Sequence, residues 1–166
     1  MYPIFQPHSR KLLIAVLALL FAVQASASLS LERSTLVQDD QGGSFSAQTS
    51  GTLDIPGSDL ITTASFSAFH PGSDNQQIDG EVVRARVRHA EGVLTTLNGS
   101  LLFTGVGQDN NEPISLQFND LVIERDAVEI ELSGSVTVNG EFIDAAEMPG
   151  KVRAILRRVL RFLRYD

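Results

Sequence analysis

The feature that most constrains the fold is an alternation of apolar and polar side chains, which runs from Leu29 to Ile143 with a period of two residues. An extended chain with this period is apolar on one face and polar on the other, which is typical of half-buried strands in antiparallel sheets. The positions on the apolar face are, segment by segment, Phe45, Ala47, Thr49, Leu53 and Ile55; Val83, Ala85 and Val87; Leu97, Leu101 and Phe103; Ile114, Leu116 and Phe118; and Val128, Ile130, Leu132, Val136, Val138 and Phe142. The pattern predicts about eight strands. They would form a single all-β antiparallel domain, either barrel-like or a two-sheet sandwich.

Glycine marks the places where these strands turn or bend. Asn139-Gly140 separates two short alternating segments, which predicts a two-residue hairpin. Gly51, Gly99 and Gly134 lie near the start of three similar segments, SGTLDIPG, NGSLLFTG and SGSVTVNG. Glycine inside a strand marks a bulge or a tight bend, so we interpret these three positions as bends that let the sheet curl. Whether the segments share an origin or are merely alike as short strands stays open.

After Ile143 the period changes to that of a helix. Asp144 to Glu147 predicts one capped helical turn, Pro149-Gly150 interrupts it, and Lys151–Tyr165 predicts a C-terminal amphipathic α-helix. The apolar side of this helix consists of Val152, Ile155, Leu156, Val159, Leu160, Phe162 and Leu163. The basic side consists of Lys151, Arg153, Arg157, Arg158, Arg161 and Arg164.

Three roles for this helix stay open. It would contact a membrane surface or an envelope protein through Lys151, Arg153, Arg157, Arg158, Arg161, Arg164, Ile155, Val159 and Leu163. Alternatively, its apolar side packs on the sheet while its arginines meet acidic residues of the body. An isolated helix of about 15 residues is marginal in water, so the apolar side needs some partner. The third alternative is a disordered tail.

Charge is distributed unevenly between the body and the C-terminal segment. Residues 28–150 contain five basic and nineteen acidic residues, whereas Lys151 to Asp166 contains six basic residues and one acidic residue. Such asymmetry indicates an interacting tail or an intramolecular contact. The acidic body would repel phosphate, so we expect no nucleic acid partner.

The first 27 residues have the pattern of a secretory signal peptide. Arg10 and Lys11 precede an apolar run from Leu12 to Val23, and Ala25-Ser26-Ala27 supplies small residues for cleavage after Ala27. The alternative is an uncleaved N-terminal anchor, but the run is short for a spanning helix of about 20 residues. We therefore expect an extracytoplasmic protein, periplasmic or secreted. Its parts would be a signal peptide over 1–27, one antiparallel β domain over 28–144, and a connector with the basic helix over 145–166.

Residues with chemical potential are few. Arg84, Arg86 and Arg88 would project from one face of a strand and form a ladder for phosphate or sulfate groups. The alternative is a solvated face balanced by cross-strand acids such as Glu129 and Glu131.

Metal ions and cofactors have no recognisable motif in the sequence. Acid-rich loops such as Asp39-Asp40 hold oxygen ligands of the kind that Ca²⁺ uses, but acidic residues also serve turns. His70 and His89 without any cysteine make a poor zinc set. No nucleophile elbow, phosphate loop or dinucleotide fingerprint is present in the sequence. We therefore expect no metal site, no cofactor and no catalytic residues.

These observations predict a non-enzymatic binding or structural protein of the cell envelope or the extracellular space, with an unidentified ligand. One alternative is a lipocalin-like carrier of an apolar small molecule, whose cavity would be lined by Leu97, Leu101, Phe103, Leu116 and Phe118. A second alternative is an uncharacterised hydrolase with a cleft that gathers His70 or His89 with perturbed acids.

Overall fold

The computed structural model describes residues 28–54, 57–72, 76–105, 112–126 and 128–163, and within them it contains eight strands and two helical segments. The strands are β1 (Leu29–Gln38), β2 (Ser44–Leu53), β3 (Ser58–Phe69), β4 (Gln77–Arg88), β5 (Val93–Thr104), β6 (Ile114–Arg125), β7 (Ile130–Val138) and β8 (Glu141–Asp144). A 3₁₀ helix, η1 (Ala145–Glu147), and an α-helix, α2 (Gly150–Phe162), follow. The prediction of antiparallel strands with a C-terminal helix is confirmed.

The strands form one sheet rather than a barrel or a sandwich. Their order in the sheet is their order in the chain, and every neighbouring pair is antiparallel. Within the described residues β1 and β8 do not pair with each other, so the sheet stays open. The helix α2 covers the apolar inner face of the sheet. The face is therefore shielded from water without a second sheet, as in a sandwich, and without closure of the sheet into a barrel.

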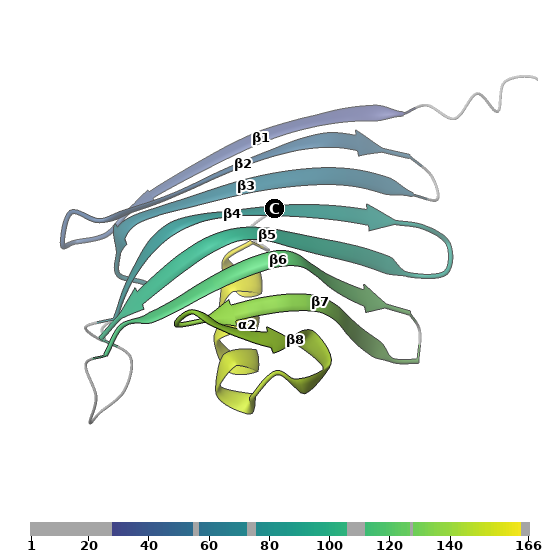
Figure 1. The fold of residues 1–166 in the computed structure, drawn as a ribbon. Coiled ribbons are helices and arrows are strands. Elements are labelled where there is room, and N and C mark those ends of the chain that lie inside the picture. Colours follow the sequence, from purple (N-terminus) through teal and green to yellow (C-terminus); the bar gives the residue numbers. More distant parts are fainter. Residues whose placement is uncertain (1–27, 55–56, 73–75, 106–111, 127, 164–166) are drawn as a thin grey trace, which may run out of the picture.

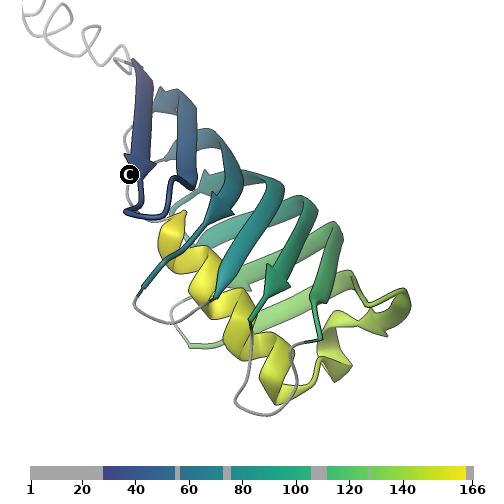
Figure 2. The same cartoon turned by 90° about the vertical axis from the view of Figure 1, so that its left-hand side faces the viewer.

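The sheet curves around the helix (Figure 1), and α2 runs obliquely across its concave face (Figure 2). The chain enters α2 beside β7 and β8, and its C-terminal end reaches β2 and β3, where Phe162 contacts Phe45, Phe66 and Phe69 at centroid distances of 6.0 to 6.2 Å. The hydrophobic core lies between the two layers. Its fully buried members from the sheet include Ile78, Val82, Leu97, Phe103, Leu116, Phe118, Leu121 and Val136. The helical side contributes Val152, Ile155, Leu156 and Val159 of α2 and Leu163 directly after it.

Glycines allow the strands to approach closely where the sheet bends. Gly99 has a φ of +127°, and a Cβ there would lie 2.3 Å from the carbonyl oxygen of Glu81 on β4. Gly134 has a φ of +87°, and a Cβ there would lie 2.2 Å from the carbonyl oxygen of Asp120 on β6. Only glycine fits such positions without displacing the neighbouring backbone. The interpretation of these glycines as bends agrees with their positive φ angles.

The β7–β8 connection is the predicted two-residue hairpin. Asn139 has a φ of +50° and Gly140 a φ of +85°, which is the combination required by a type I′ turn. The same asparagine ties the hairpin to β6, because its side-chain oxygen accepts a 2.7 Å hydrogen bond from the Ser115 amide and its own amide donates to the Ser115 carbonyl.

The connector to α2 also follows its sequence. The carboxylate of Asp144 accepts a 2.9 Å hydrogen bond from the Ala146 amide and so caps η1. Pro149 precedes the first residue of α2, which ends at Phe162, whereas the sequence pattern extended the helix to Tyr165; Tyr165 lies outside the described residues.

The predicted signal peptide over 1–27 and its cleavage site after Ala27 also lie outside the described residues. Among the residues that are described, no helix has both the length and the apolar character needed to span a membrane.

Candidate functional site

A groove of about 900 Å³ lies between the concave face of the sheet and one side of α2. Its sheet side is formed where β4 and β6 end and where β5 and β7 begin, at the right-hand end of these strands in Figure 1. The sheet contributes Arg84, Arg86, Val93, Thr95, Ile123, Arg125, Ile130 and Leu132 to the lining, and α2 contributes Arg153, Leu156, Arg157, Leu160 and Arg161.

Two of the arginines reach the groove from β4. Arg84 and Arg86 lie on the same side of this strand as Ile78 and Val82, which are fully buried in the core. The sequence pattern placed the other side, with Val83, Ala85 and Val87, on the buried face. In the structure that side is the outer one, and Val87 is 38% exposed.

The register of β4 with its neighbours decides this orientation. Arg84 pairs with Thr62 on β3 and with Leu97 on β5, and both partners are buried on the inner face. A run in which apolar and basic residues alternate is compatible with either orientation, because both sides repeat every two residues. The sequence signal was therefore present, but its direction was assigned wrongly.

The predicted ladder does not form one exposed surface. Arg84 is 4% exposed, Arg86 is half-buried in the groove, and Arg88 is exposed and does not line it. The acids that were expected to balance these arginines lie elsewhere, since the neighbours of β4 are β3 and β5 while Glu131 is on β7.

A bulge in β6 brings Ile123 and Arg125 into the groove. The register between β6 and β7 shifts between Asn119 and Val122, and Asp120 has a φ of +48°. The Asn98 side chain holds this bulge with two 2.8 Å hydrogen bonds, one from its amide group to the Asp120 carboxylate and one from the Asp120 backbone amide to its oxygen. An extra residue in one strand reverses which side chains face inward beyond it. Sequence reasoning missed Arg125 for this reason.

The helical side of the groove follows from helical spacing. Arg153, Arg157 and Arg161 are four residues apart and share one side of α2, as residues at i and i+4 do. Leu156 and Leu160 lie next to them, where the basic side of the helix meets its core-facing side. The groove therefore has an apolar floor and a basic rim.

The charge of the groove is opposite to that of the body. Three of the five basic residues between positions 28 and 150 line it, and none of the nineteen acidic residues in that range is among its described lining residues. Arginines gathered in one groove raise the positive potential there. The expected pairing of helix arginines with acids of the body is not observed, because within the described part of the chain no arginine of α2 forms an ion pair with a carboxylate.

Arg84 has a structural role at one end of the groove. It donates hydrogen bonds to the backbone carbonyl of Leu163, just after α2, and to the Thr62 hydroxyl at 3.2 Å. The Thr62 and Thr49 hydroxyls are 2.9 Å apart and extend this buried polar network to β2. A positive charge at a helix C-terminus is favourable because the last carbonyl groups carry partial negative charge. Arg84 therefore holds the end of α2 on the sheet.

Arg153 lies at the other end of α2. One guanidinium nitrogen donates a 2.9 Å hydrogen bond to the carbonyl of Ala146 in η1. Its Nε is buried and makes no hydrogen bond to any of the described residues. A buried donor without an acceptor costs free energy.

The residues expected at a membrane or partner contact divide into two groups. Ile155, Val159 and Leu163 are core residues, so the apolar side of the helix packs on the sheet rather than facing a membrane. Lys151, Arg157, Arg158 and Arg161 are exposed, Arg153 is half-buried, and Arg164 lies outside the described residues.

A second, smaller groove of about 470 Å³ also borders α2 and shares Arg157 and Arg161 with the first. Gln76, Phe103, Ile155 and Lys151 are among its lining residues. The Arg158 guanidinium donates a hydrogen bond to the side-chain oxygen of Gln76 across it. This contact fixes α2 against the start of β4.

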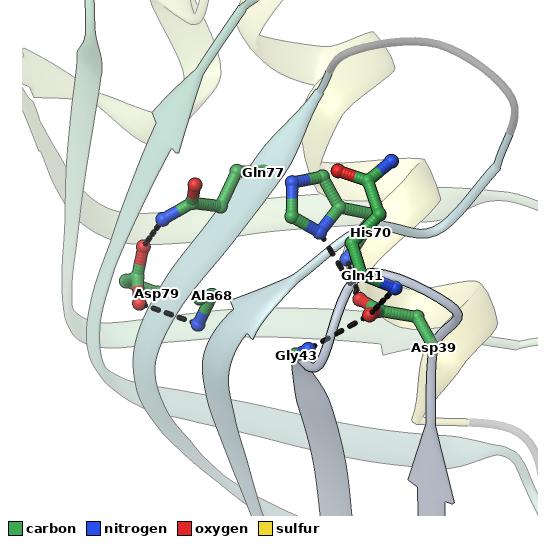
Figure 3. A network of polar contacts seen from close by, with 7 residues as sticks. All are labelled: Asp39, Gln41, Gly43, Ala68, His70, Gln77 and Asp79. Atoms are coloured by element: carbon green, nitrogen blue, oxygen red, sulfur yellow. Dashed lines mark hydrogen bonds and ion pairs between the residues drawn. The ribbon is translucent and has the colours of Figure 1, made fainter.

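Asp39, a carboxylate with several hydrogen bonds, stabilises a turn (Figure 3). It accepts hydrogen bonds from the backbone amides of Gln41 at 2.9 Å, Gly43 at 2.7 Å and His70 at 2.7 Å, and its Oδ2 lies 3.1 Å from the His70 Nδ1. These donors, the His70 amide foremost, lower the pKa of Asp39 to about 2. Asp39 thus joins the β1–β2 turn to the end of β3.

Catalytic or metal chemistry has little support in this arrangement. Neither groove is lined by His70 or His89. Within the stretches that the structure describes, no three histidine or acidic side chains are placed to hold a metal ion. Asp39, the acid beside His70, owes its low pKa first to the His70 backbone amide and then to amides of the β1–β2 turn.

Comparison with known proteins adds no relative: no family model, no curated protein sequence and no solved structure matches this chain significantly.

Proposed function

We propose that the protein is a non-enzymatic, extracytoplasmic binding protein that takes an acidic ligand in the groove between α2 and the sheet. The observation that carries this proposal is the composition of the groove, in which six arginines and no acidic side chain are found among the described lining residues of an otherwise acidic protein. Its volume of about 900 Å³ lies within the range of roughly 300–1,000 Å³ that is typical of small-molecule sites.

The lipocalin-like alternative would need a cavity at Leu97, Leu101, Phe103, Leu116 and Phe118. All five side chains are buried in the core under α2, with exposures of 0 to 2%. A carrier function would therefore have to use the groove between α2 and the sheet. This leaves an acidic ligand as the better supported choice, because the rim of that groove is basic.

The proposal is tested by charge reversal at one exposed groove arginine. The purified protein is titrated with anilinonaphthalene sulfonate, a fluorescent anionic probe, and the dissociation constant is measured for the wild type and for Arg125→Glu. We expect Arg125→Glu to weaken binding about tenfold, because it removes a charge-assisted hydrogen bond and adds repulsion. Raising the salt concentration should weaken wild-type binding as well.

Arg33→Glu is the matched control, since Arg33 is also an exposed arginine in a strand but lies on β1, outside the groove. If both variants bind the probe equally well, the acidic-ligand proposal is wrong.

The extracytoplasmic location is tested separately. When the full sequence is expressed in a bacterial host, we expect the protein to be found outside the cytoplasm. Mass spectrometry should then give the mass of a chain whose first residue is Ser28. An intact chain in the cytoplasm would contradict this part of the proposal.

A further inference from the structure

We infer that the ligand of the groove is an anionic amphiphile with one acidic head group and one hydrocarbon chain. This inference rests on the proposed function and adds the class of ligand. About half of the lining is apolar, and a ligand that consists only of an acidic group would leave these side chains in contact with water.

The floor of the groove is apolar on both sides. Val93, Ile123, Ile130 and Leu132 contribute from the sheet, and Leu156 and Leu160 contribute from α2. Ile123, Leu132 and Leu160 are partly buried against the core, so the floor continues the core toward solvent. Ile130 at its outer end is 62% exposed. One exposed and several half-buried apolar side chains that line a concavity together are typical of a binding site.

The basic rim surrounds this floor from two elements. Arg125 lies at the end of β6, and Arg157 and Arg161 lie along α2, all three exposed to solvent. Arginine forms paired hydrogen bonds with carboxylate, phosphate and sulfate groups. The geometry therefore offers an acidic group several partners at the rim while a chain attached to it lies over the floor.

A small inorganic anion would use only the rim. It would leave Ile130 and Leu132 in contact with water, whereas a hydrocarbon chain would cover them. Transfer of each methylene group from water into an apolar site contributes enough to tighten binding about fourfold. The match of floor and rim favours an amphiphile over a free anion or an acidic peptide.

The test compares four probes by isothermal titration of the purified protein, expressed from its complete coding sequence. The probes are dodecyl phosphate, inorganic phosphate, a tetraglutamate peptide and dodecyl maltoside, each detergent below its micelle concentration. We expect dodecyl phosphate to bind at least about 50-fold more tightly than inorganic phosphate or the peptide, which corresponds to roughly three buried methylene groups. Dodecyl maltoside, with the same chain and a neutral head group, should bind about tenfold more weakly than dodecyl phosphate.

Matched isoleucine variants locate the chain. Ile130→Ser should weaken dodecyl phosphate binding about fivefold and leave phosphate and peptide binding unchanged. Ile61→Ser should change neither, because Ile61 is a 49% exposed isoleucine on the outer face of β3. Thermal melting of both variants verifies that they are folded.

The outcomes separate this inference from the proposed function. If phosphate or tetraglutamate binds as tightly as dodecyl phosphate, and Arg125→Glu weakens that binding, the inference of an amphiphilic ligand is wrong. The proposal of an acidic ligand then still holds. If Ile61→Ser weakens the binding of dodecyl phosphate as much as Ile130→Ser does, the inference of an amphiphilic ligand is also wrong. If dodecyl maltoside binds as tightly as dodecyl phosphate, the head group contributes nothing and both proposals fail.

Discussion

The concave face of the sheet has two halves that differ in what covers them. Toward β2 and β3, Phe162 of α2 lies against Phe45, Phe66 and Phe69, and the face is closed by tight packing. Toward the ends of β4 to β7, α2 presents arginines instead, and a groove of about 900 Å³ remains. One helix and one sheet form both halves. The comparison teaches that side-chain chemistry along a single interface separates a closely packed region from an open groove lined by arginines.

Removal of residues 151–166 should have the largest effect, because it abolishes the difference between the two halves. The truncated chain would expose the whole inner face, including Leu97, Phe103 and Leu116, which are buried now. We expect no cooperative thermal transition by circular dichroism, since one open sheet cannot bury its apolar side alone. An unchanged melting temperature would show that α2 is not part of the core.

Phe162→Ala tests the packed half. We expect a loss of about 2–4 kcal/mol in the free energy of unfolding, from the lost apolar burial and the lost ring contacts. Phe142→Ala removes a ring that is 69% exposed and should change the free energy of unfolding by less than about 0.5 kcal/mol. Arg157→Ala, on the groove side of the same helix, should also stay within about 0.5 kcal/mol. Urea unfolding measures all three, and equal losses would remove the distinction between the halves.

Arg84→Met probes the boundary between the halves. This change leaves the Leu163 carbonyl and the Thr62 hydroxyl without their guanidinium donor. Loss of buried hydrogen bonds to a charged group should lower the free energy of unfolding by about 1–3 kcal/mol. Lys in place of Arg84 offers a charge without the planar fork and should recover only part of this loss. Full stability in Arg84→Met would mean that packing alone holds the end of α2.

Asp39→Asn should change the melting temperature least of these variants near neutral pH. Its main effect should be on how the melting temperature depends on pH. The pKa of Asp39 is lowered to about 2 from 3.8, chiefly by the hydrogen bond from the His70 backbone amide and further by those from the turn amides of Gly43 and Gln41. The ionised carboxylate therefore stabilises the fold fully above its unfolded pKa, and this contribution is lost as the pH falls from about 4 through about 2. We expect the melting temperature of the wild type to fall more steeply over this range than that of Asp39→Asn.

Asp40→Asn is the control for this pH series, since Asp40 is the exposed neighbour in the same turn. A wild-type profile parallel to that of Asp39→Asn would contradict the role of Asp39 in the turn.

The sequence by itself determined the elements of this protein. Alternation over Leu29–Ile143 predicted the antiparallel strands, Asn139-Gly140 predicted the hairpin, and the helical spacing after Lys151 predicted α2. These properties depend on residues within a few positions of one another, because strand and helix periods and turn geometry are local.

Tertiary structure alone decided which face of β4 lies inside, where β6 bulges, and that the sheet stays open around its helix. Arg84 and the carbonyl of Leu163 are 79 residues apart in the chain, and no local pattern relates them. The groove exists because strand register and helix placement bring Arg125, Ile130 and Arg157 together. Register and packing depend on contacts between distant segments, and for this reason the arginines of β4 and α2 could be recognised in the sequence while Arg125 and the common site could not.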